Sequence, residues 1–190
     1  MPPPGTLFAQ TPPKVYLASM KHLLPLLLLL GLSLSAHAQG VKLDKATLPQ
    51  TTVTTLDGET VAFADLHQPG KPMIVSFWAT WCKPCIQELS AIHNEYPDWQ
   101  ADTDVTLVAV SIDDSRNQGK VQSFVNGKAW DYTVVLDPNS DLKRSMNVNN
   151  VPHSFIIDGQ GRVVWQHNSY KAGDEYEMYD KLVELAEAAE

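Results

Sequence analysis

The sequence predicts an α/β fold with a mixed central sheet, and three features of the chain predict it. Apolar, strand-like runs alternate with segments of helical periodicity from residue 72 to residue 146. Two short extended segments around a D-G turn precede this alternation, and a hairpin and a helix follow it. Strands joined through helices pair in parallel, whereas hairpins pair antiparallel. We therefore expect a mixed sheet that is flanked by helices.

The first elements expected are a hairpin and a buried strand. Residues 53–63 are expected to form the hairpin around Asp57-Gly58, a dipeptide typical of two-residue turns. A polar loop follows. Residues 72–78 are mostly apolar but include Ser76, as in a central strand that is covered on both faces.

The middle of the chain predicts two helices and a strand. Apolar residues recur at helical spacing from residue 86 to residue 96, and Pro97 is expected to end or kink that helix. Residues 105–112 predict a strand rich in β-branched residues. Residues 113–115 are expected to cap the next helix and Gly127 to end it. The predicted inner faces comprise Ile86, Leu89, Ile92 and Tyr96 in the first helix, and Val121, Phe124 and Val125 in the second.

The last third of the chain predicts a strand, a short helix, a hairpin and a final helix. Residues 132–136 predict the strand, and a short helix is expected around Leu142 and Met146. Residues 153–167 predict an antiparallel hairpin, and the final helix opens at Asp174 with acids in its first turn, where they suit the helix dipole. The predicted apolar face of this helix comprises Tyr176, Tyr179, Leu182, Val183 and Ala186.

Length and composition fit one globular domain preceded by a targeting segment. The 190 residues are 44% apolar, which is ordinary for a packed core and argues against disorder throughout. The formal charge is −8, and residues 39–190 carry −10, because residues 1–38 hold two lysines and no acid. An acidic body without a basic run argues against nucleic acid as a partner.

Residues 20–38 have the features of a secretory signal peptide. Lys21 is followed by a leucine-rich run of about a dozen residues and by an A-x-A cleavage site that ends at Ala38. The run is short for a membrane span, which takes about 20 residues, so no stable span is expected after cleavage. An uncleaved anchor is the alternative.

The predicted organisation has three parts. Residues 1–38 comprise the signal and, before Met20, a proline-rich stretch that we interpret as an over-extended start. Residues 39–46 are a short linker, and residues 47–190 are one domain. The signal implies an extracytoplasmic compartment, such as the periplasm.

The two cysteines, Cys82 and Cys85, carry the clearest chemical signal in the chain. A pair at this spacing can close a disulfide on itself. If Lys83 and Pro84 open a helix, the Cys82 sulfur lies at the positive end of its dipole, which favours the nucleophilic thiolate. Half a zinc site is disfavoured because no second cysteine pair exists, and an inert disulfide because so short a loop adds little stability. Redox chemistry is the favoured interpretation.

Several segments of the chain occur in a specific combination. They are Phe77 to Cys85 (FWATWCKPC), the Asp137-Pro138 turn, Val148 to Asp158 with Val151-Pro152, and the Asp158 to Arg162 turn. In these segments the chain resembles the extracytoplasmic TlpA/ResA type of thiol–disulfide oxidoreductase, within the redoxin or AhpC/TSA superfamily. The likeness covers Thr47 to Glu190. It implies a thioredoxin fold with an N-terminal hairpin and an inserted βα element.

The resemblance implies roles for the motif residues. Cys82 attacks a substrate disulfide and Cys85 resolves the mixed disulfide, an order that the exposure of a helix-capping cysteine also favours. Pro152 is implied to be a cis proline that faces the cysteines, and an ordinary trans proline is the alternative. The backbone of Val151 is implied to pair with an extended substrate segment. The implied substrate-binding surface comprises Trp81, Lys83, Pro84, Val151 and Pro152.

Glu88 is the third residue expected to be catalytic. It lies three residues after Cys85 on the same helix face, and the resemblance implies that its carboxylate relays protons for the thiols. Ordinary thioredoxin does this with a buried aspartate six residues before the first cysteine, where this chain has Ser76. A solvated surface glutamate is the alternative. His153, where the family usually has threonine, either holds a charge near the cysteines at mildly acid pH or occupies the sheet surface.

The expected function is reduction of protein disulfides outside the cytoplasm by a monomer without cofactor or metal. By resemblance, the clients are apocytochrome c or other envelope proteins, and a membrane thiol carrier supplies electrons. A peroxiredoxin is one alternative, although its P-x-x-x-T-x-x-C pattern is absent around Cys82. A redox-inert binding module or metal chaperone is another, although His67, His93 and His167 show no ligand spacing.

Overall fold

The computed structural model describes residues 48–188. The predicted signal peptide and linker, together with the predicted domain start at residue 47, lie outside the described residues. Within residues 48–188, no helix combines the length and the hydrophobicity needed to cross a bilayer.

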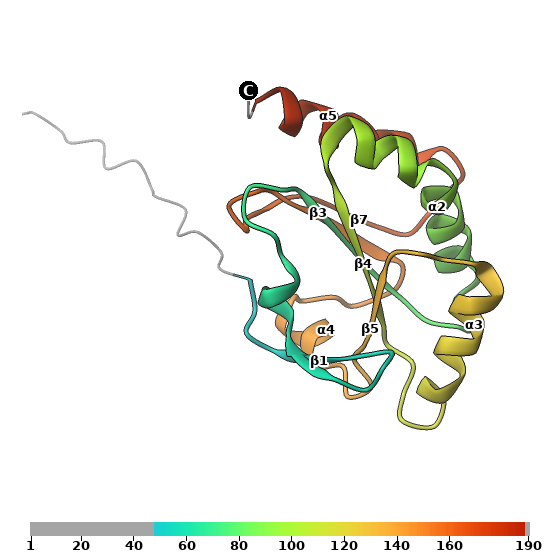
Figure 1. Ribbon diagram of the computed structural model, residues 1–190. Coiled ribbons are helices and arrows are strands. Elements are labelled where there is room, and N and C mark those ends of the chain that lie inside the picture. Colours follow the sequence, from blue (N-terminus) through green and yellow to red (C-terminus); the bar gives the residue numbers. More distant parts are fainter. Residues whose placement is uncertain (1–47, 189–190) are drawn as a thin grey trace, which may run out of the picture. The chain divides into compact units, whose positions relative to one another are not determined.

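In the described part of the chain, seven strands form one mixed sheet in the order β2-β1-β5-β4-β3-β6-β7 (Figure 1). The strands are β1 (Thr52–Thr55), β2 (Thr60–Ala62), β3 (Met73–Trp78), β4 (Thr106–Ser111), β5 (Thr133–Leu136), β6 (His153–Ile157) and β7 (Val163–Asn168). The helices are α2 (Lys83–Thr103), α3 (Val121–Lys128), α4 (Asp141–Ser145) and α5 (Asp174–Glu187), with 3₁₀ turns η2 (Phe63–Leu66) and η3 (Gln118–Lys120). The predicted mixed α/β sheet flanked by helices is confirmed.

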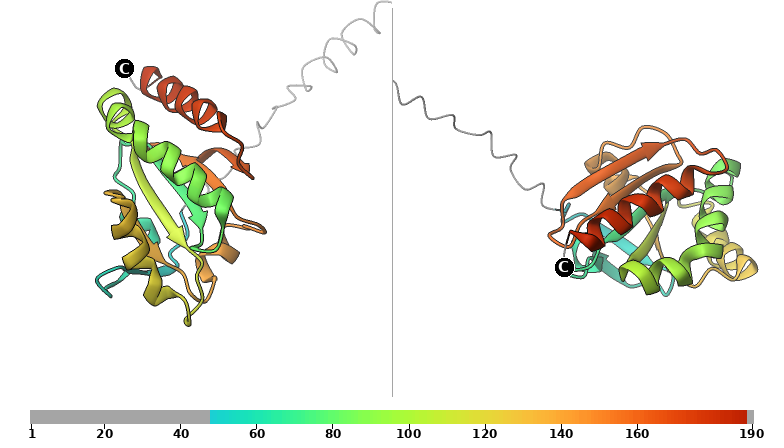
Figure 2. Two further views of the ribbon diagram at one scale, coloured as in Figure 1. Left: turned by 90° about the vertical axis from the view of Figure 1, so that its right-hand side faces the viewer. Right: turned by 90° about the horizontal axis from the view of Figure 1, so that it is seen from above.

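The strand β3 lies at the centre of the core. It is parallel to β4 and antiparallel to β6, and all six of its side chains are buried. Alternate side chains pack on one face against α2, α3 and α5, and on the other against α4 and the N-terminal hairpin. Figure 2 shows α2 and α5 side by side. Cover on both faces explains why the segment is mostly apolar.

The helix after the cysteines is longer than the sequence predicts. It continues through Pro97 to Thr103, so the expectation that Pro97 ends it is wrong. Buried aromatic residues anchor the helix on both sides of the proline. Tyr96 accepts a hydrogen bond from the Leu107 N–H at 2.9 Å, and Trp99 is 3% exposed. This packing keeps the segment helical although proline lacks an N–H donor.

The helix α3 also departs from its predicted bounds. It begins at Val121 without a side-chain cap, so the cap predicted at residues 113–115 is wrong. Gly127 lies inside the helix, which ends at Lys128 with Ala129 as its C-cap residue, at a φ of 55°. The cause is that Asp113 is buried and holds a different loop, which belongs to the cysteine motif.

The buried face of α5 is rotated from the predicted one. Met178, which was not predicted to be buried, and Leu182 have no exposed surface, whereas Tyr176 is 61% exposed. Tyr179 packs at the edge of the face, stacked on Trp99 with 5.5 Å between the ring centroids. Residues four apart lie on one side of a helix, so the pair at 178 and 182 sets the face that α5 turns inward.

The turn between β6 and β7 closely approaches the loop before β3. The Gly159 carbonyl accepts a hydrogen bond from the Gly70 N–H at 2.8 Å. A Cβ atom on Gly159 would lie 2.7 Å from the carbonyl carbon of Gly70. Because the contact is with backbone, no side-chain movement can relieve it.

We expect Gly159→Ala to lower the free energy of unfolding by about 1–3 kcal/mol, because the methyl group overpacks this contact. Gly127→Ala is the matched control: nothing lies within 4 Å of its added Cβ, and alanine in a helix should stabilise by about 0.5–1 kcal/mol. Urea denaturation of both variants measures the difference. Equal stability of Gly159→Ala and wild type would contradict the packing argument.

Candidate active site

The two cysteines form a disulfide where the chain passes from β3 into α2. Their sulfur atoms are 1.98 Å apart and their Cα atoms 5.3 Å apart. Cys82 is the N-cap residue of α2, and its sulfur accepts a hydrogen bond from the Cys85 N–H at 3.4 Å. Lys83 and Pro84 begin the helix, as predicted. The Cys82 sulfur therefore lies at the positive end of the helix dipole, where a thiolate is stabilised.

Residues around the disulfide differ in exposure. Cys85 has no exposed surface, whereas Cys82 is 5% exposed and is thus the more accessible of the two. Trp81, directly before it, is 65% exposed, and Lys83 and Pro84 are exposed as well. These three predicted substrate-binding residues therefore lie at the surface beside the more accessible cysteine.

A buried carboxylate holds the loop before the cysteines. Asp113 accepts hydrogen bonds from the Thr80 N–H at 2.8 Å, from Thr80 Oγ1 at 2.6 Å and from Ser111 Oγ at 2.9 Å. This position differs from the helix cap that the sequence predicts for Asp113. The sequence offers one signal for this role of Asp113, which follows the carboxyl end of β4, a strand parallel to β3. The carboxyl ends of parallel strands meet at one edge of a sheet, so Asp113 lies near the loop that follows β3.

The Val151–Pro152 peptide bond is cis, as the resemblance implies. β6 begins at His153, which lies opposite Phe77 near the end of β3. Since the two strands are antiparallel, the proline lies at the same end of the sheet as the cysteine motif. Pro152 is buried, and Val151 is half-buried and packs against the core on both faces of the sheet.

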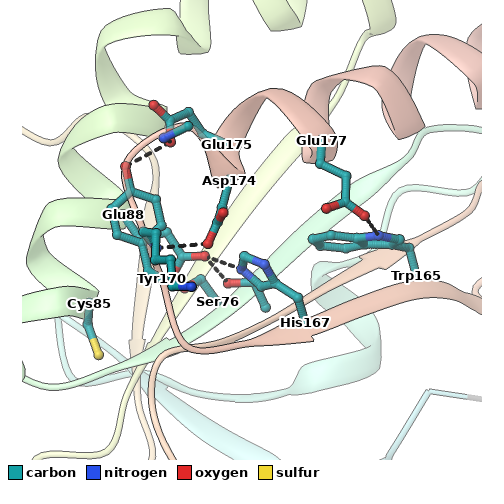
Figure 3. A network of polar contacts seen from close by, with 12 residues as sticks. Ser76, Cys85, Glu88, Trp165, His167, Tyr170, Asp174, Glu175 and Glu177 are labelled. Carbon is teal, nitrogen blue, oxygen red and sulfur yellow. Dashed lines mark hydrogen bonds and ion pairs between the residues drawn. The ribbon is translucent and has the colours of Figure 1, made fainter.

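Glu88 is a buried residue, which excludes the solvated-surface alternative. It is 1% exposed. Its Oε1 accepts a hydrogen bond from Ser154 Oγ at 2.9 Å and lies 2.7 Å from His167 Nε2. Its Oε2 accepts a longer hydrogen bond, 3.5 Å, from Ser76 Oγ. Figure 3 shows His167 and Ser76 beside the carboxylate.

The partners of Glu88 come from one row of residues across three strands. Ser76 of β3 pairs with Ser154 of β6, and Ser154 pairs with His167 of β7. From the sequence, Ser76 is only the position of the thioredoxin aspartate and His167 only a histidine without ligand spacing, and Ser154 is not singled out. Each is an isolated polar residue in its own strand, so that only the register between the strands reveals the row.

The carboxylate of Glu88 has no hydrogen bond to either sulfur among the described residues. Cys85 lies one turn away on α2, and its sulfur points outside the hydrogen-bonded network in Figure 3. A proton moving between Cys85 and Glu88 therefore needs a bridging water or a side-chain movement once the disulfide opens.

His153 occupies the other face of the sheet. Its ring stacks on Phe155 with 4.4 Å between the centroids, and its Nε2 lies 3.1 Å from Gln166 Oε1. Burial lowers the pKa of His153 and outweighs the hydrogen bond to Gln166, which raises it. This geometry favours the interpretation in which His153 occupies the sheet surface without a charge.

The fold and the Cys82–Cys85 disulfide define the class that the sequence predicts, a thiol–disulfide oxidoreductase. The model of the AhpC/TSA family matches residues 45–166, and the chain belongs to this family. The chain is similar to the thiol–disulfide oxidoreductase ResA of Bacillus thuringiensis (strain Al Hakam). The two are 31% identical over 135 residues, which cover 71% of this chain and 75% of that protein.

Two solved structures extend the likeness to the fold. One is the solution structure of an uncharacterized thioredoxin-like protein from Porphyromonas gingivalis, with a TM-score of 0.69, 46% identity, and cover of 77% of this chain and 95% of that one. The other is a secreted Mycobacterium tuberculosis disulfide oxidoreductase homologous to E. coli DsbE, with a TM-score of 0.55, 26% identity, and cover of 73% and 96%. The predicted thioredoxin fold and the likeness to ResA are confirmed.

We expect Asp113→Ala to lower the free energy of unfolding by about 1–3 kcal/mol, because the Thr80 N–H loses its partner. Asp114→Ala is the control, since that carboxylate is exposed and caps only its own turn; its loss should stay below about 1 kcal/mol. Urea denaturation compares the two variants. Equal losses would show that Asp113 has no special part in holding the cysteine loop.

Proposed function

We propose that this protein reduces protein disulfides outside the cytoplasm through the Cys82–Cys85 couple. The observation that carries the proposal is the disulfide at the N-terminus of α2, with Cys82 as the capping residue and Cys85 buried within the first turn. This arrangement gives one cysteine that can meet a substrate and a second that only the first can reach.

The reaction takes place in two exchanges. The Cys82 thiolate attacks one sulfur of the substrate disulfide, a mixed disulfide forms, and the other substrate sulfur leaves and takes up a proton. Cys85 then loses its proton and attacks the Cys82 sulfur, so that the mixed disulfide breaks and the second substrate thiol leaves. The substrate gains the two electrons and two protons that the dithiol loses.

Glu88 is proposed to accept the proton that Cys85 loses. Its burial beside the helix turn of Cys85 supports this role, since a carboxylate in this place is shielded from bulk water. The proposed substrate surface comprises Trp81, Lys83, Pro84, Val151 and Pro152. The cis proline lies at the same end of the sheet as the cysteine motif. We propose that the backbone of Val151, directly before it, pairs with an extended substrate segment.

The proposed location is the periplasm or its equivalent. It is supported by the signal-like residues 20–38 and by the likeness to a secreted disulfide oxidoreductase. In that compartment a reducing dithiol needs an electron supply, for which a membrane thiol carrier is proposed. Apocytochrome c and other envelope proteins are the proposed clients of a monomeric enzyme.

We expect wild type to reduce insulin in the presence of a dithiol, and Cys82→Ala to show only the uncatalysed rate because it lacks the nucleophile. Cys85→Ala should accumulate mixed disulfides with its substrate, since nothing resolves them. Turbidity of precipitating insulin chains measures the first result and non-reducing electrophoresis the second. Equal rates for wild type and Cys82→Ala would contradict the proposed activity and favour the redox-inert binding module.

The direction of electron flow is tested by the reduction potential of the couple. A value near that of thioredoxin, about −270 mV, supports the reductase, and a value near that of the strong oxidant DsbA, about −120 mV, overturns it. Peroxide consumption by the reduced protein tests the peroxiredoxin alternative, and metal titration of the reduced protein tests the metal-chaperone alternative. Within residues 48–188, no three His, Cys, Asp or Glu side chains form a group that could hold a metal ion.

We expect Glu88→Gln to move the pH dependence of Cys82 alkylation to lower pH by about one unit, because a nearby anion disfavours the thiolate. Iodoacetamide reaction rates of the reduced protein across the pH range measure the shift. Glu95→Gln, on the same helix, is the control and should leave the profile unchanged. Identical profiles for Glu88→Gln and wild type would refute the proton-handling role.

A further inference from the structure

We propose that His167 carries protons between the buried Glu88 carboxylate and solvent, and thereby sets the pH range in which Cys85 resolves the mixed disulfide. The inference rests on the proposed function, in which Glu88 takes up the Cys85 proton. It gives a role in the reaction to a histidine on β7, the edge strand of the sheet.

The hydrogen-bonded route from Glu88 toward solvent passes through the imidazole ring. His167 Nε2 lies 2.7 Å from Glu88 Oε1, and the exposed fraction of the side chains rises from 1% for Glu88 to 17% for His167. The two other partners of the carboxylate, Ser76 and Ser154, have no exposed surface. Among residues 48–188, His167 is therefore the one hydrogen-bond partner of the carboxylate through which a proton can reach water.

The ring of His167 lies on the face of the sheet that carries Glu88, where the negative charges of Asp174 and Glu177 on α5 act on it. Its side chain is 17% exposed, so water can reach the ring from this side. Histidine has two ring nitrogens, so that one can accept a proton from the carboxylate while the other releases one to water.

Neighbouring groups favour the charged form of the ring. Burial lowers the pKa of His167, but the hydrogen bond and the negative charge of Glu88 outweigh it and raise the pKa. The Trp165 ring packs against the His167 ring, with 4.8 Å between the two centroids. The Nε1 of Trp165 donates a hydrogen bond to Glu177 at 3.3 Å. The titratable groups that face or border the site are Glu88 from α2, His153 from β6, Asp174, Glu175 and Glu177 from α5, and Tyr170 from the loop before α5.

The proton balance follows from this geometry. Before resolution, Glu88 is a carboxylate paired with the imidazolium of His167. The proton from the Cys85 thiol passes to Glu88, and the imidazolium releases one proton to solvent, which leaves a carboxylic acid hydrogen-bonded to a neutral ring. The Cys85 thiolate is thereby free to attack the Cys82 sulfur, and the charge of the Glu88–His167 pair is the same before and after.

The test follows the attack of Cys85 directly. An aromatic disulfide of nitrothiobenzoate reacts with reduced protein at Cys82 and releases one coloured thiol, and the attack of Cys85 then releases a second. Stopped-flow absorbance from about pH 5 to about pH 9 covers the range in which histidine titrates. The variants are His167→Gln, Glu88→Gln and the double variant. His93→Gln is the matched control, because His93 lies on α2 beside the exposed Asp131.

We expect His167→Gln to slow the second release about 100-fold at neutral pH, the lower end of the effect of losing an acid–base group. His93→Gln should behave as wild type, and the double variant should be no slower than Glu88→Gln, because His167 acts through Glu88. An unchanged pH profile in His167→Gln overturns the proposal. Losses that multiply in the double variant overturn it too, since the two residues then act independently.

A second measurement separates proton transfer from a structural role. In His167→Ala the space left by the ring can admit free imidazole, which should restore the rate of the second release in proportion to its concentration. A rate that imidazole does not change shows that His167 only supports the fold, and the proposal fails. If wild type itself never releases the second thiol, the proposed function fails instead.

Discussion

A carboxylate that is 1% exposed must find hydrogen-bond donors inside the protein, because an unpaired buried charge costs several kcal/mol. Glu88 finds them in Ser76, Ser154 and His167, which lie in one row only in the observed register of β3, β6 and β7. A slip of one residue in β6 would turn Ser154 to the opposite face of the sheet. The same register places Pro152 beyond the end of β3, at the end of the sheet from which the chain enters the cysteine motif.

Features that depend on neighbours in the sequence could be predicted. The helix start at Cys82 was predictable because a proline after a capping residue is a local signal, and the buried central strand because its apolar run is nearly continuous. The roles of Cys85, Glu88 and Pro152 came from a resemblance whose motifs are specific. The structure confirms the cis bond of Pro152 and shows that Glu88 is buried, while the roles of these residues in the reaction stay predictions.

Features that depend on pairing between distant segments could not be predicted. The carboxylate of Asp113 had a plausible local use as a helix cap, and only the parallel pairing of β3 with β4 brings it to Thr80. Tertiary packing likewise outweighed a local signal at Pro97, where buried aromatic residues on both sides keep α2 intact. His167 was overlooked for the same reason as Ser154, since neither carries a signal until the strands are aligned.

In the proposed mechanism, the pairing of Glu88 with a histidine resolves a conflict between two requirements of the site. A proton acceptor must lie close to the cysteines, yet a negative charge there disfavours the thiolate that attacks the substrate. An imidazolium at His167 offsets part of the charge of the carboxylate, and the carboxylate can still accept a proton. Burial lowers the pKa of His153, which favours its neutral form, so that His153 adds no second positive charge from the far face of the sheet. The proposal thus separates the two tasks: sulfur exchange at the exposed end of α2, and proton release through His167 on the edge strand.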